Sequence, residues 1–348
     1  MIKKICPDLF LRIYLPGDEG AILSSWKKIF KKELSVEEWR WKFLGCPGGC
    51  KILLCFNESG EVAVHYAGQM YRTVLDDGQE IWALHLVDIF SLPEYRWIFP
   101  GKYGLFVEVA KYFLKTFLED FPVEEGYALQ AEGPKASFYY GFPGKRHFLL
   151  GEKVLFYRRF SAGTIYLRKI ATPNLDIRTK MIKDFGSFEN LSPEEVNTLW
   201  QKFWKKWRWF SVIKDWSFFH WRYLSHPRKN YRIFVQRGGF LKKRLEGWLV
   251  AAPPDEGRDT YKILDFVALS PRILEKLLKK VLHSFKEKDI EVWLPGNHPW
   301  LNIFENLGFK REEEPLGFIA ARGFDNNNKF SPEKADHFVW GFGEADLF

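Results

Sequence analysis

The segment that most clearly combines residue types for chemistry covers residues 94–106 and reads EYRWIFPGKYGLF. Gly101 and Gly104 come directly before a stretch with the period of an amphipathic helix, and Arg96 and Lys102 accompany them. Backbone amides at the start of a helix bind anions, and a glycine lets a phosphate approach the backbone closely. The segment therefore favours an anion site, although Pro-Gly and Gly also suit an ordinary turn.

A strand with ionisable side chains precedes this turn. Residues 82–90, WALHLVDIF, alternate as a β-strand does, which places Asp88 on one face with Leu84 and Leu86, and His85 on the other face. A carboxylate or an imidazole at such a place can act as a general base. The alternatives are a structural hydrogen bond for Asp88 and an ordinary strand position for His85.

Metal chemistry is not expected from the cysteines. Three of the four lie in the run CPGGCKILLC, as Cys46, Cys50 and Cys55. A structural zinc site usually needs four ligands with C-x2-C spacing, and this run has neither. We expect free thiols and no bound metal.

The composition is that of a folded globular protein. The chain has 348 residues, a net charge of +8, 46% apolar residues and 15 Trp, which is enough for two domains, and the basic balance suits an anionic ligand. No apolar run approaches the ~20 residues that cross a bilayer, and Pro7, Asp8 and Arg12 interrupt the apolar start of the chain. We therefore expect a cytoplasmic protein that does not associate with membranes.

A heptad of the sequence is nearly repeated. WKFLGCP begins at Trp41 and WRYLSHP begins at Trp221, so that Lys42 in the first heptad corresponds to Arg222 in the second. The apolar runs KILLCFN and YRIFVQR follow the two heptads at the same distance, and both have the character of strands. The repeated heptad and the apolar run that follows it therefore indicate an internal duplication.

Each copy continues with the same predicted elements. Strands that contain Asp88 and Asp265 lead through Pro into amphipathic helices. A short strand, a brief helix and Gly-Phe should follow, which in the first copy we assign to YALQAEGPKASFYYGF. We expect an N-terminal domain over residues 1–165, a C-terminal domain over 166–325 and a tail over 326–348.

These residues resemble the GNAT superfamily of N-acyltransferases in its tandem-domain form. EEWRWKFL with its following Pro, VDIFSLPEYR before a glycine-containing turn, and the closing Gly-Phe runs carry the resemblance over about Leu15 to Arg322. It implies an α/β (α+β) fold with two GNAT-like domains, each a mixed, mostly antiparallel sheet flanked by helices. It also implies acetyl-CoA or another acyl-CoA as co-substrate, with the pyrophosphate on the Gly-rich turn.

The first copy is the expected holder of the cofactor. The second copy has Ser270 and Pro271 but no glycine before its helix, and Pro271 removes an amide that a diphosphate would need. The first copy departs from the family pattern by about four extra residues, WIFP, before its first glycine. The resemblance implies these cofactor-binding residues: Arg96, Gly101, Lys102, Tyr103 and Gly104.

Acylation of an amine requires removal of a proton from the amine and a proton for the leaving thiolate. By analogy with the family's helical tyrosine we expect Tyr139 to be the acid, with packing as the alternative. Asp88 and Glu132 are the expected bases, although the recurrence of Asp88 as Asp265 favours a structural role, and water alone could suffice. The terminal carboxylate of Phe348 is a further candidate, because some members of the family direct their C-terminus into the active site.

The predicted function is that of an acyl-CoA-dependent N-acyltransferase, which moves an acyl group, expected to be acetyl, to a small-molecule or peptide amine by direct attack. A tRNA-dependent aminoacyl transferase of similar fold is a second interpretation, and a tandem binding module without catalysis is a third. Apart from tRNA we expect no nucleic-acid partner, because the sequence has no reader motif and its lysines lie among acidic residues.

Overall fold

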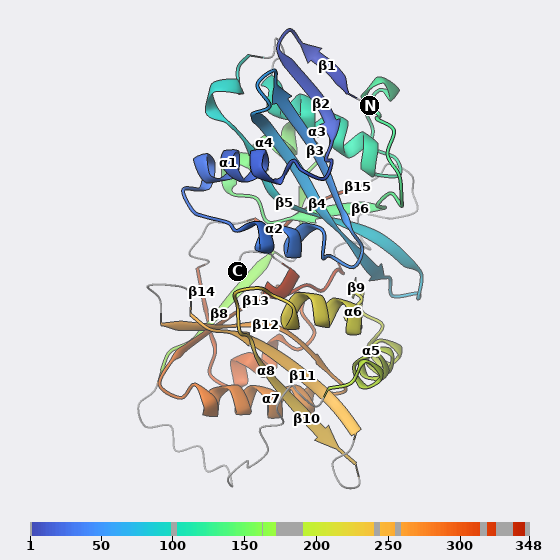
Figure 1. The fold of residues 1–348 in the computed structure, drawn as a ribbon. Coiled ribbons are helices and arrows are strands. Elements are labelled where there is room, and N and C mark those ends of the chain that lie inside the picture. The colour runs from blue at the N-terminus through green and yellow to red at the C-terminus, as the bar shows by residue number, and fades with distance from the viewer. Residues whose placement is uncertain are drawn as a thin grey trace. The chain divides into compact units, whose positions relative to one another are not determined.

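The chain forms two compact units in the computed structural model (Figure 1). The N-terminal unit comprises Met1–Thr73, Glu80–Phe160 and Phe318–Ala335, and the C-terminal unit comprises Val74–Gln79, Ser161–Gly317 and Asp336–Phe348. The residues that the structure describes are 2–98, 103–161, 163–171, 191–239, 244–254, 259–313, 319–324 and 337–344. No helix among them is both long and apolar enough to cross a membrane.

The N-terminal unit is built on a mixed sheet with the strand order β1-β2-β3-β4-β5-β6-β15-β7. Its strands are β1 (Lys3–Cys6), β2 (Leu9–Ile13), β3 (Cys50–Asn57), β4 (Val62–Val74), β5 (Glu80–Ser91), β6 (Phe138–Gly141), β7 (Arg158–Arg159) and β15 (Ala321–Phe324). Its helices are α1 (Glu19–Phe30), α2 (Val36–Phe43), α3 (Gly104–Phe117) and α4 (Lys145–Val154), with 3-10 turns η1 (Pro93–Tyr95) and η2 (Glu125–Tyr127).

Both faces of this sheet are covered. Along β3 the side chains alternate, so that Leu53 and Cys55 pack in the core formed with α3 and α4, whereas Ile52 and Leu54 pack in the core formed with α1 and α2. The strand is therefore apolar over most of its length because neither face meets water.

The C-terminal unit has a six-stranded sheet in the order β10-β11-β12-β13-β8-β14. Its strands are β8 (Thr164–Lys169), β9 (Ser211–Val212), β10 (Arg232–Gly238), β11 (Arg244–Ala252), β12 (Thr260–Ala268), β13 (Asp289–Pro295) and β14 (Lys310–Glu312), of which β9 lies outside the six. Its helices are α5 (Pro193–Trp207), α6 (Trp216–Phe219), α7 (Pro271–Ser284) and α8 (Leu301–Asn306), with a π-helical turn η4 (His220–Leu224) and a 3-10 turn η6 (Phe342–Glu344).

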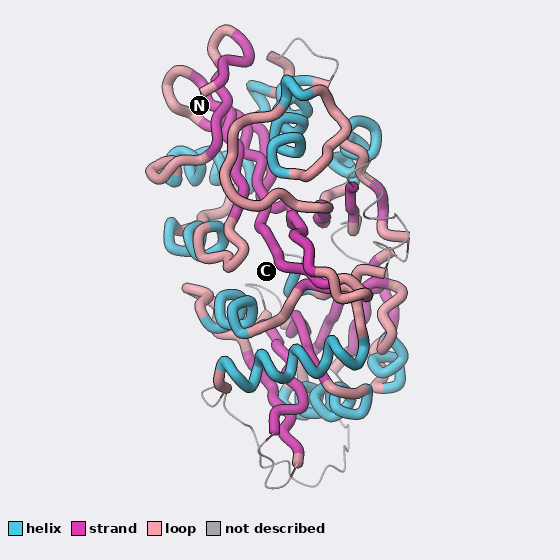
Figure 2. The backbone as a smooth tube through the Cα atoms, turned by 90° about the vertical axis from the view of Figure 1, so that its right-hand side faces the viewer, coloured by secondary structure: helices cyan, strands magenta, loops and turns pink. Residues whose placement is uncertain are grey.

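The predicted duplication is visible in the order of elements along the chain. Figure 2 shows the helices and strands of both units on the backbone tube. In both units two helical segments lead to three antiparallel strands, then a helix, a strand parallel to the third, a helix and a short strand. Matching helix starts support this: in α2 the Ser35 hydroxyl accepts from the Glu38 amide, and in the corresponding α6 the Asp215 carboxylate accepts from the Phe218 amide. Helix α5 begins at a capping box of Ser192 and Glu195 with Pro193 at its first position.

Each sheet also contains a strand from the other half of the sequence. Strand β15, which follows the second copy, lies between β6 and β7 and is antiparallel to both. Strand β8, which follows the first copy, lies between β13 and β14 in the same way. The ranges 1–165, 166–325 and 326–348 stay a prediction; strand β15 belongs to the N-terminal unit and strand β8 to the C-terminal unit.

One predicted local structure is wrong. The brief helix expected before Gly141 is instead strand β6, parallel to β5, with Ala83–His85 in register with Phe138–Tyr140. The helix of this copy follows at α4. The run FYYG has the β-branched or aromatic character of a strand and is too short for its period to distinguish the two structures.

Candidate functional site

Strand β5 is distorted at Asp88. The residue has φ 47°, in the left-handed region, although it lies inside a strand. The other non-glycine residues with positive φ in the described part of the chain are Lys31, Phe156 and Arg208, and each lies at or just after the end of a helix. Such a backbone conformation costs of order 1–3 kcal/mol and persists where the surroundings hold it, often at functional sites.

The distortion reverses the alternation of the strand. Leu86 packs in the core on the α3 side and Val87 in the core on the α2 side, as expected, but after Asp88 it is Ile89 that packs on the α3 side and Phe90 on the α2 side. The regular alternation that placed Asp88 with Leu84 and Leu86 is therefore wrong, as it would be at any β-bulge.

Two side chains hold Asp88. The Lys42 ammonium of α2 lies 2.7 Å from the Asp88 carboxylate, and both side chains are largely buried. The Nδ1 atom of His65, on β4, lies 2.8 Å from the Asp88 carbonyl oxygen. Because a carbonyl can only accept, Nδ1 carries the hydrogen and donates it.

His65 is a neutral, fully buried side chain. Its ring stacks on Phe90 at 5.2 Å between centroids and meets the edge of Phe43 at 5.9 Å. Burial lowers the pKa of His65 to about 4, the hydrogen bond to Asp88 opposes this, and the Lys42 charge adds to the lowering. The imidazole therefore donates a hydrogen bond at neutral pH without carrying charge.

The turn between β5 and α3 is described in part. Gly101 and Lys102 lie outside the described residues. The Arg96 guanidinium donates to the hydroxyl and the carbonyl of Ser91, at 3.2 and 3.1 Å. Gly104 has φ 70°, and a Cβ there would lie 2.2 Å from the Arg96 carbonyl oxygen, so the closure of this turn requires glycine.

The starts of α3 and α7 differ. Tyr103, the N-cap residue of α3, makes no side-chain cap hydrogen bond, and its ring has the Lys153 ammonium 5.8 Å from its centroid. In α7 the Ser270 hydroxyl accepts from the Ile273 amide at 3.3 Å, and Pro271 has no amide hydrogen. The amides at the start of α7 are thus partly used or missing, as the sequence predicts.

The structure does not bring the expected catalytic residues together. Tyr139 lies on β6, fully buried, and its hydroxyl donates to the Leu155 carbonyl oxygen; burial raises its pKa well above the ordinary value. Glu132 is exposed, and its backbone carbonyl accepts from the Lys51 ammonium at 3.0 Å. His85 is buried, and its ring stacks on Tyr140 at 4.7 Å.

Sequence reasoning missed His65 and Lys42. His65 is an imidazole inside the apolar run VAVHYAG, and Lys42 belongs to the repeated heptad. Both signals were visible, but neither indicates which residue the side chain contacts.

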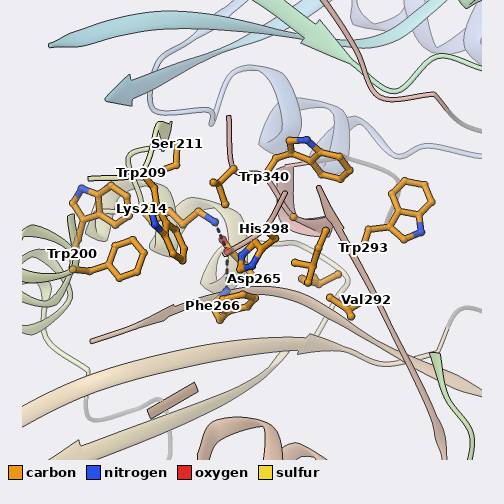
Figure 3. A pocket seen from close by; sticks show the side chains of 15 residues that line it. Trp200, Trp209, Ser211, Lys214, Asp265, Phe266, Val292, Trp293, His298 and Trp340 are labelled. Atoms are coloured by element: carbon orange, nitrogen blue, oxygen red, sulfur yellow. Dashed lines mark hydrogen bonds and ion pairs between the residues drawn. The ribbon is translucent and has the colours of Figure 1, made fainter. Parts of the chain in front are cut away.

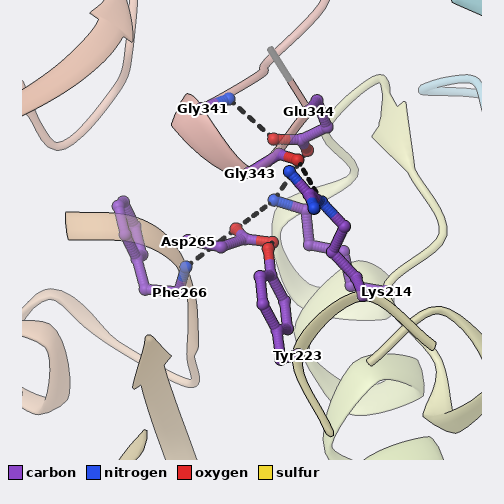
Figure 4. A network of polar contacts seen from close by, with 8 residues as sticks. Lys214, Tyr223, Asp265, Phe266, Gly341, Gly343 and Glu344 are labelled. Atoms are coloured by element: carbon purple, nitrogen blue, oxygen red, sulfur yellow. Dashed lines mark hydrogen bonds and ion pairs between the residues drawn. The ribbon is translucent and has the colours of Figure 1, made fainter. Parts of the chain in front are cut away.

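The equivalent aspartate of the C-terminal unit lies in a buried ionic cluster (Figure 4). The Asp265 carboxylate accepts from the Lys214 ammonium, from the Tyr223 hydroxyl at 2.8 Å and from the Phe266 amide at 2.8 Å. Residues 337–344 form the C-terminal segment, and its Glu344 carboxylate lies 2.9 Å from the same Lys214 ammonium.

The charges of this cluster are coupled. Burial alone would lower the pKa of Lys214, but the charges of Asp265 and Glu344 outweigh it and raise that pKa. Burial raises the pKa of Glu344 to about 7, against the lowering effect of Lys214. The cluster therefore titrates near neutral pH at Glu344.

The C-terminal segment occupies the place where β12 and β13 cease to pair. The pairing of these parallel strands reaches from Thr260 with Asp289 to Ile263 with Val292. Beyond it, the Phe342 ring stacks on Trp293 at 4.7 Å, and a Cβ at Gly341 would lie 3.0 Å from the Leu264 carbonyl oxygen. The backbone at Gly341 therefore lies against β12 at Leu264.

This segment is anchored at several points. The Arg222 guanidinium donates to the Gly343 carbonyl at 2.9 Å, and the Val339 amide donates to the Phe210 carbonyl at 2.8 Å. Within the segment, the Gly341 amide donates to the Glu344 carboxylate at 2.9 Å. The segment is therefore an integral part of the C-terminal unit.

A small aromatic pocket remains beside this segment (Figure 3). Its cavity of about 20 Å³ is large enough for a water molecule. His298 lines it, and burial lowers the pKa of His298 to about 3, with a further contribution from the Lys214 charge. The aromatic side chains in the lining are Trp200, Phe203, Trp209, Phe266, Trp293 and Trp340.

Sequence comparison gives little. No family model matches the chain. An Acyl-CoA Delta-12 desaturase of Tribolium castaneum is 30% identical over 95 residues, which are 27% of this chain and 26% of that protein. The chain thus spans about a quarter of the length of this curated relative.

Solved structures resemble nearly the whole chain. A conserved protein of unknown function from Enterococcus faecalis V583, described as a probable N-acyltransferase, has a TM-score of 0.59 and 10% identity over 91% of this chain and 72% of that one. A GCN5-related N-acetyltransferase from Anabaena variabilis gives 0.58 and 9% over 90% and 72%. The Saccharomyces cerevisiae N-myristoyltransferase with bound myristoyl-CoA gives 0.56 and 8% over 93% and 82%.

At such identities the likeness establishes the fold. The predicted α/β architecture with two GNAT-like domains is confirmed, and so is the resemblance on which it was based. This chain has the fold of the GNAT superfamily, in its tandem form.

Proposed function

We propose that the protein is an acyl-CoA-dependent N-acyltransferase whose N-terminal unit binds the acyl-CoA. The fold supports acyl transfer in general, since proteins with it include N-acetyltransferases and an N-myristoyltransferase with bound myristoyl-CoA. We propose acetyl as the acyl group and a small-molecule or peptide amine as the acceptor, as the sequence suggests.

The contrast between the two equivalent aspartates carries this proposal. In the N-terminal unit Asp88 retains a strained left-handed conformation just beyond the place where β5 pairs with β6. In the C-terminal unit the Phe342 ring stacks on Trp293 and Gly341 lies against the Leu264 carbonyl in the same region of β12 and β13, and Asp265 has no left-handed φ. Strain is retained where function requires it, which favours the N-terminal unit as the functional one.

The starts of the following helices support the same choice. A helix begins with four amides that lack intrahelical partners and with the positive end of its dipole, so an uncapped start suits a diphosphate. α3 begins at Gly104 without a side-chain cap, whereas Ser270 caps α7. We propose Arg96, Gly101, Lys102, Tyr103 and Gly104 as the residues around the pyrophosphate.

The proposed reaction is a direct attack. The amine nitrogen attacks the thioester carbonyl carbon, a C–N bond forms and the C–S bond breaks, and the products are an amide and CoA with a thiol. One proton leaves the amine and one reaches the sulfur. We propose that water carries the first proton, because the Asp88 carboxylate is paired with Lys42 and Glu132 is exposed.

Binding and turnover test this proposal together. The melting temperature of the purified protein should rise by a few degrees in acetyl-CoA at about 100 times its Kd, since a ligand of the native state stabilises it by mass action. Release of free thiol in the presence of an amine panel should follow. Stabilisation by tRNA with no response to any acyl-CoA would contradict the proposal and favour an aminoacyl transferase. No response to either would favour a binding module.

A further inference from the structure

Asp88 is held at both of its ends by different elements. Lys42 on α2 binds the side chain, and His65 on β4 binds the backbone carbonyl. Fixing the carboxylate and the carbonyl restricts rotation about the Cα–Cβ and Cα–C bonds and so sets the direction of the Asp88 carbonyl. The two contacts therefore support the left-handed conformation of Asp88, which a residue inside a strand ordinarily does not have.

The chemistry of the donor makes this contact permanent across the usual pH range. His65 is fully buried between Phe43 and Phe90, and its Nδ1 hydrogen is already directed at the Asp88 carbonyl. The ring therefore has one tautomer and one orientation. A side chain fixed in this manner can hold a strained residue without exchanging protons with it.

The location of Asp88 gives its conformation a consequence. The pairing of β5 with β6 has its last residues at His85 and Tyr140, and β6 ends at Gly141 while β5 continues to Ser91. Asp88 lies in the part of β5 beyond these pairs with β6. Its backbone reverses the alternation of the strand, so it decides the direction of the β5 peptide groups and side chains that follow it.

We propose that His65 and Lys42 are positioning residues for acyl transfer, which hold Asp88 left-handed so that the β5 backbone meets the thioester in its reactive arrangement. This inference rests on the proposed function. It assigns Asp88 a conformational role, in which its carboxylate serves as an anchor for Lys42 and abstracts no proton.

The first test compares Asp88→Gly with Asp88→Ala. Both variants lack the carboxylate, but glycine adopts φ 47° without strain and alanine does not. If conformation matters, the glycine variant keeps a kcat about tenfold or more above that of the alanine variant, with the KM for acyl-CoA within about twofold in both. Equal losses in the two variants would overturn the proposal and restore the carboxylate as a base.

The second test concerns the donor. His65→Asn retains an N–H at the position of Nδ1, whereas His65→Leu retains apolar volume without a donor. The leucine variant should lower kcat about tenfold, and asparagine should recover most of that loss. In the Asp88→Gly variant the glycine adopts positive φ without support from His65. Adding His65→Leu to that variant should therefore have little further effect on kcat. A full additional loss in that background would overturn the positioning role.

Unfolding measurements keep the two proposals separable. If the wild-type protein neither binds acyl-CoA nor releases thiol, the proposed function fails and the catalytic consequence of Asp88 falls with it. Whether His65 holds the conformation of Asp88 is still tested by unfolding. His65→Leu should shift the unfolding midpoint of the Asp88→Ala variant more than that of the Asp88→Gly variant. Equal shifts would refute it.

Discussion

The Glu344 carboxylate and the Lys214 ammonium lie 2.9 Å apart, and the carboxylate is fully buried. Lys214 also pairs with Asp265, so that one ammonium is shared between two buried carboxylates. Two negative charges around one positive charge in a poorly solvated place make one carboxylate hold its proton more tightly. Here that residue is Glu344, whose pKa is raised to about 7.

We expect Glu344 to make stability fall as the pH rises. Its folded pKa of about 7 exceeds the ordinary value of 4.5, so the folded state binds the proton more tightly and the benefit, at most about 3 kcal/mol, is lost between about pH 4.5 and 7. Glu344→Gln mimics the protonated form. The difference in unfolding free energy between the variant and the wild type should therefore increase in favour of the variant from pH 5 to 8, as measured by denaturant titration.

A matched control for that measurement is Glu33→Gln, which removes an exposed carboxylate paired with Lys27. It should leave the pH dependence unchanged, because exposed ion pairs contribute little. A Glu344→Gln difference that stays constant over this range would show that the carboxylate does not titrate there.

His298 should make the free energy of unfolding fall as the pH falls, which is opposite to the pH dependence expected from Glu344. Its folded pKa of about 3 lies below the ordinary 6.5, so its contribution to stability is complete above pH 6.5 and is lost as the pH falls towards 3. In the wild type the Trp300 amide donates a hydrogen bond to His298 Nδ1 at 3.1 Å. The variant His298→Asn keeps an acceptor for that amide. We expect the variant to lose less stability than the wild type between pH 6.5 and 4. Parallel curves would contradict the shifted pKa.

Gly104→Ala should weaken acyl-CoA binding. The new Cβ would lie 2.2 Å from the Arg96 carbonyl oxygen, which is backbone and can yield only if the turn opens. We expect about a tenfold loss of affinity in calorimetric titration with acetyl-CoA. Gly308→Ala is the control: its φ of 86° is equally unsuited to alanine, but the Cβ there meets the flexible end of Lys169. Equal losses in both variants would indicate a general effect of destabilisation.

Tyr139→Phe distinguishes packing from acid catalysis. The hydroxyl donates to the Leu155 carbonyl, so its removal should cost about 1–3 kcal/mol of unfolding free energy by leaving a buried acceptor unsatisfied. We expect kcat to stay within about threefold of the wild type. A fall of 10²-fold or more, the usual size for loss of a general acid, would restore Tyr139 as the proton donor.

The sequence by itself determined the architecture and its duplication. The repeated heptads at Trp41 and Trp221 and the apolar runs that follow them are local signals, and each predicts its element from neighbouring residues alone. The GNAT fold followed from their order. The difference between the starts of the two helices was also visible, because Pro271 and Ser270 act within a single turn.

The tertiary structure decided what depends on pairing between distant residues. The contact of His65 with Asp88 joins two strands, the placement of β8 and β15 joins each sheet to the opposite half of the sequence, and Glu344 reaches Lys214 across more than a hundred residues. The run around Tyr139 became a strand because β5 was available to pair with it. Periodicity describes which face of an element is apolar, but the partner of that face, and the burial that shifts a pKa, exist only once the chain has folded.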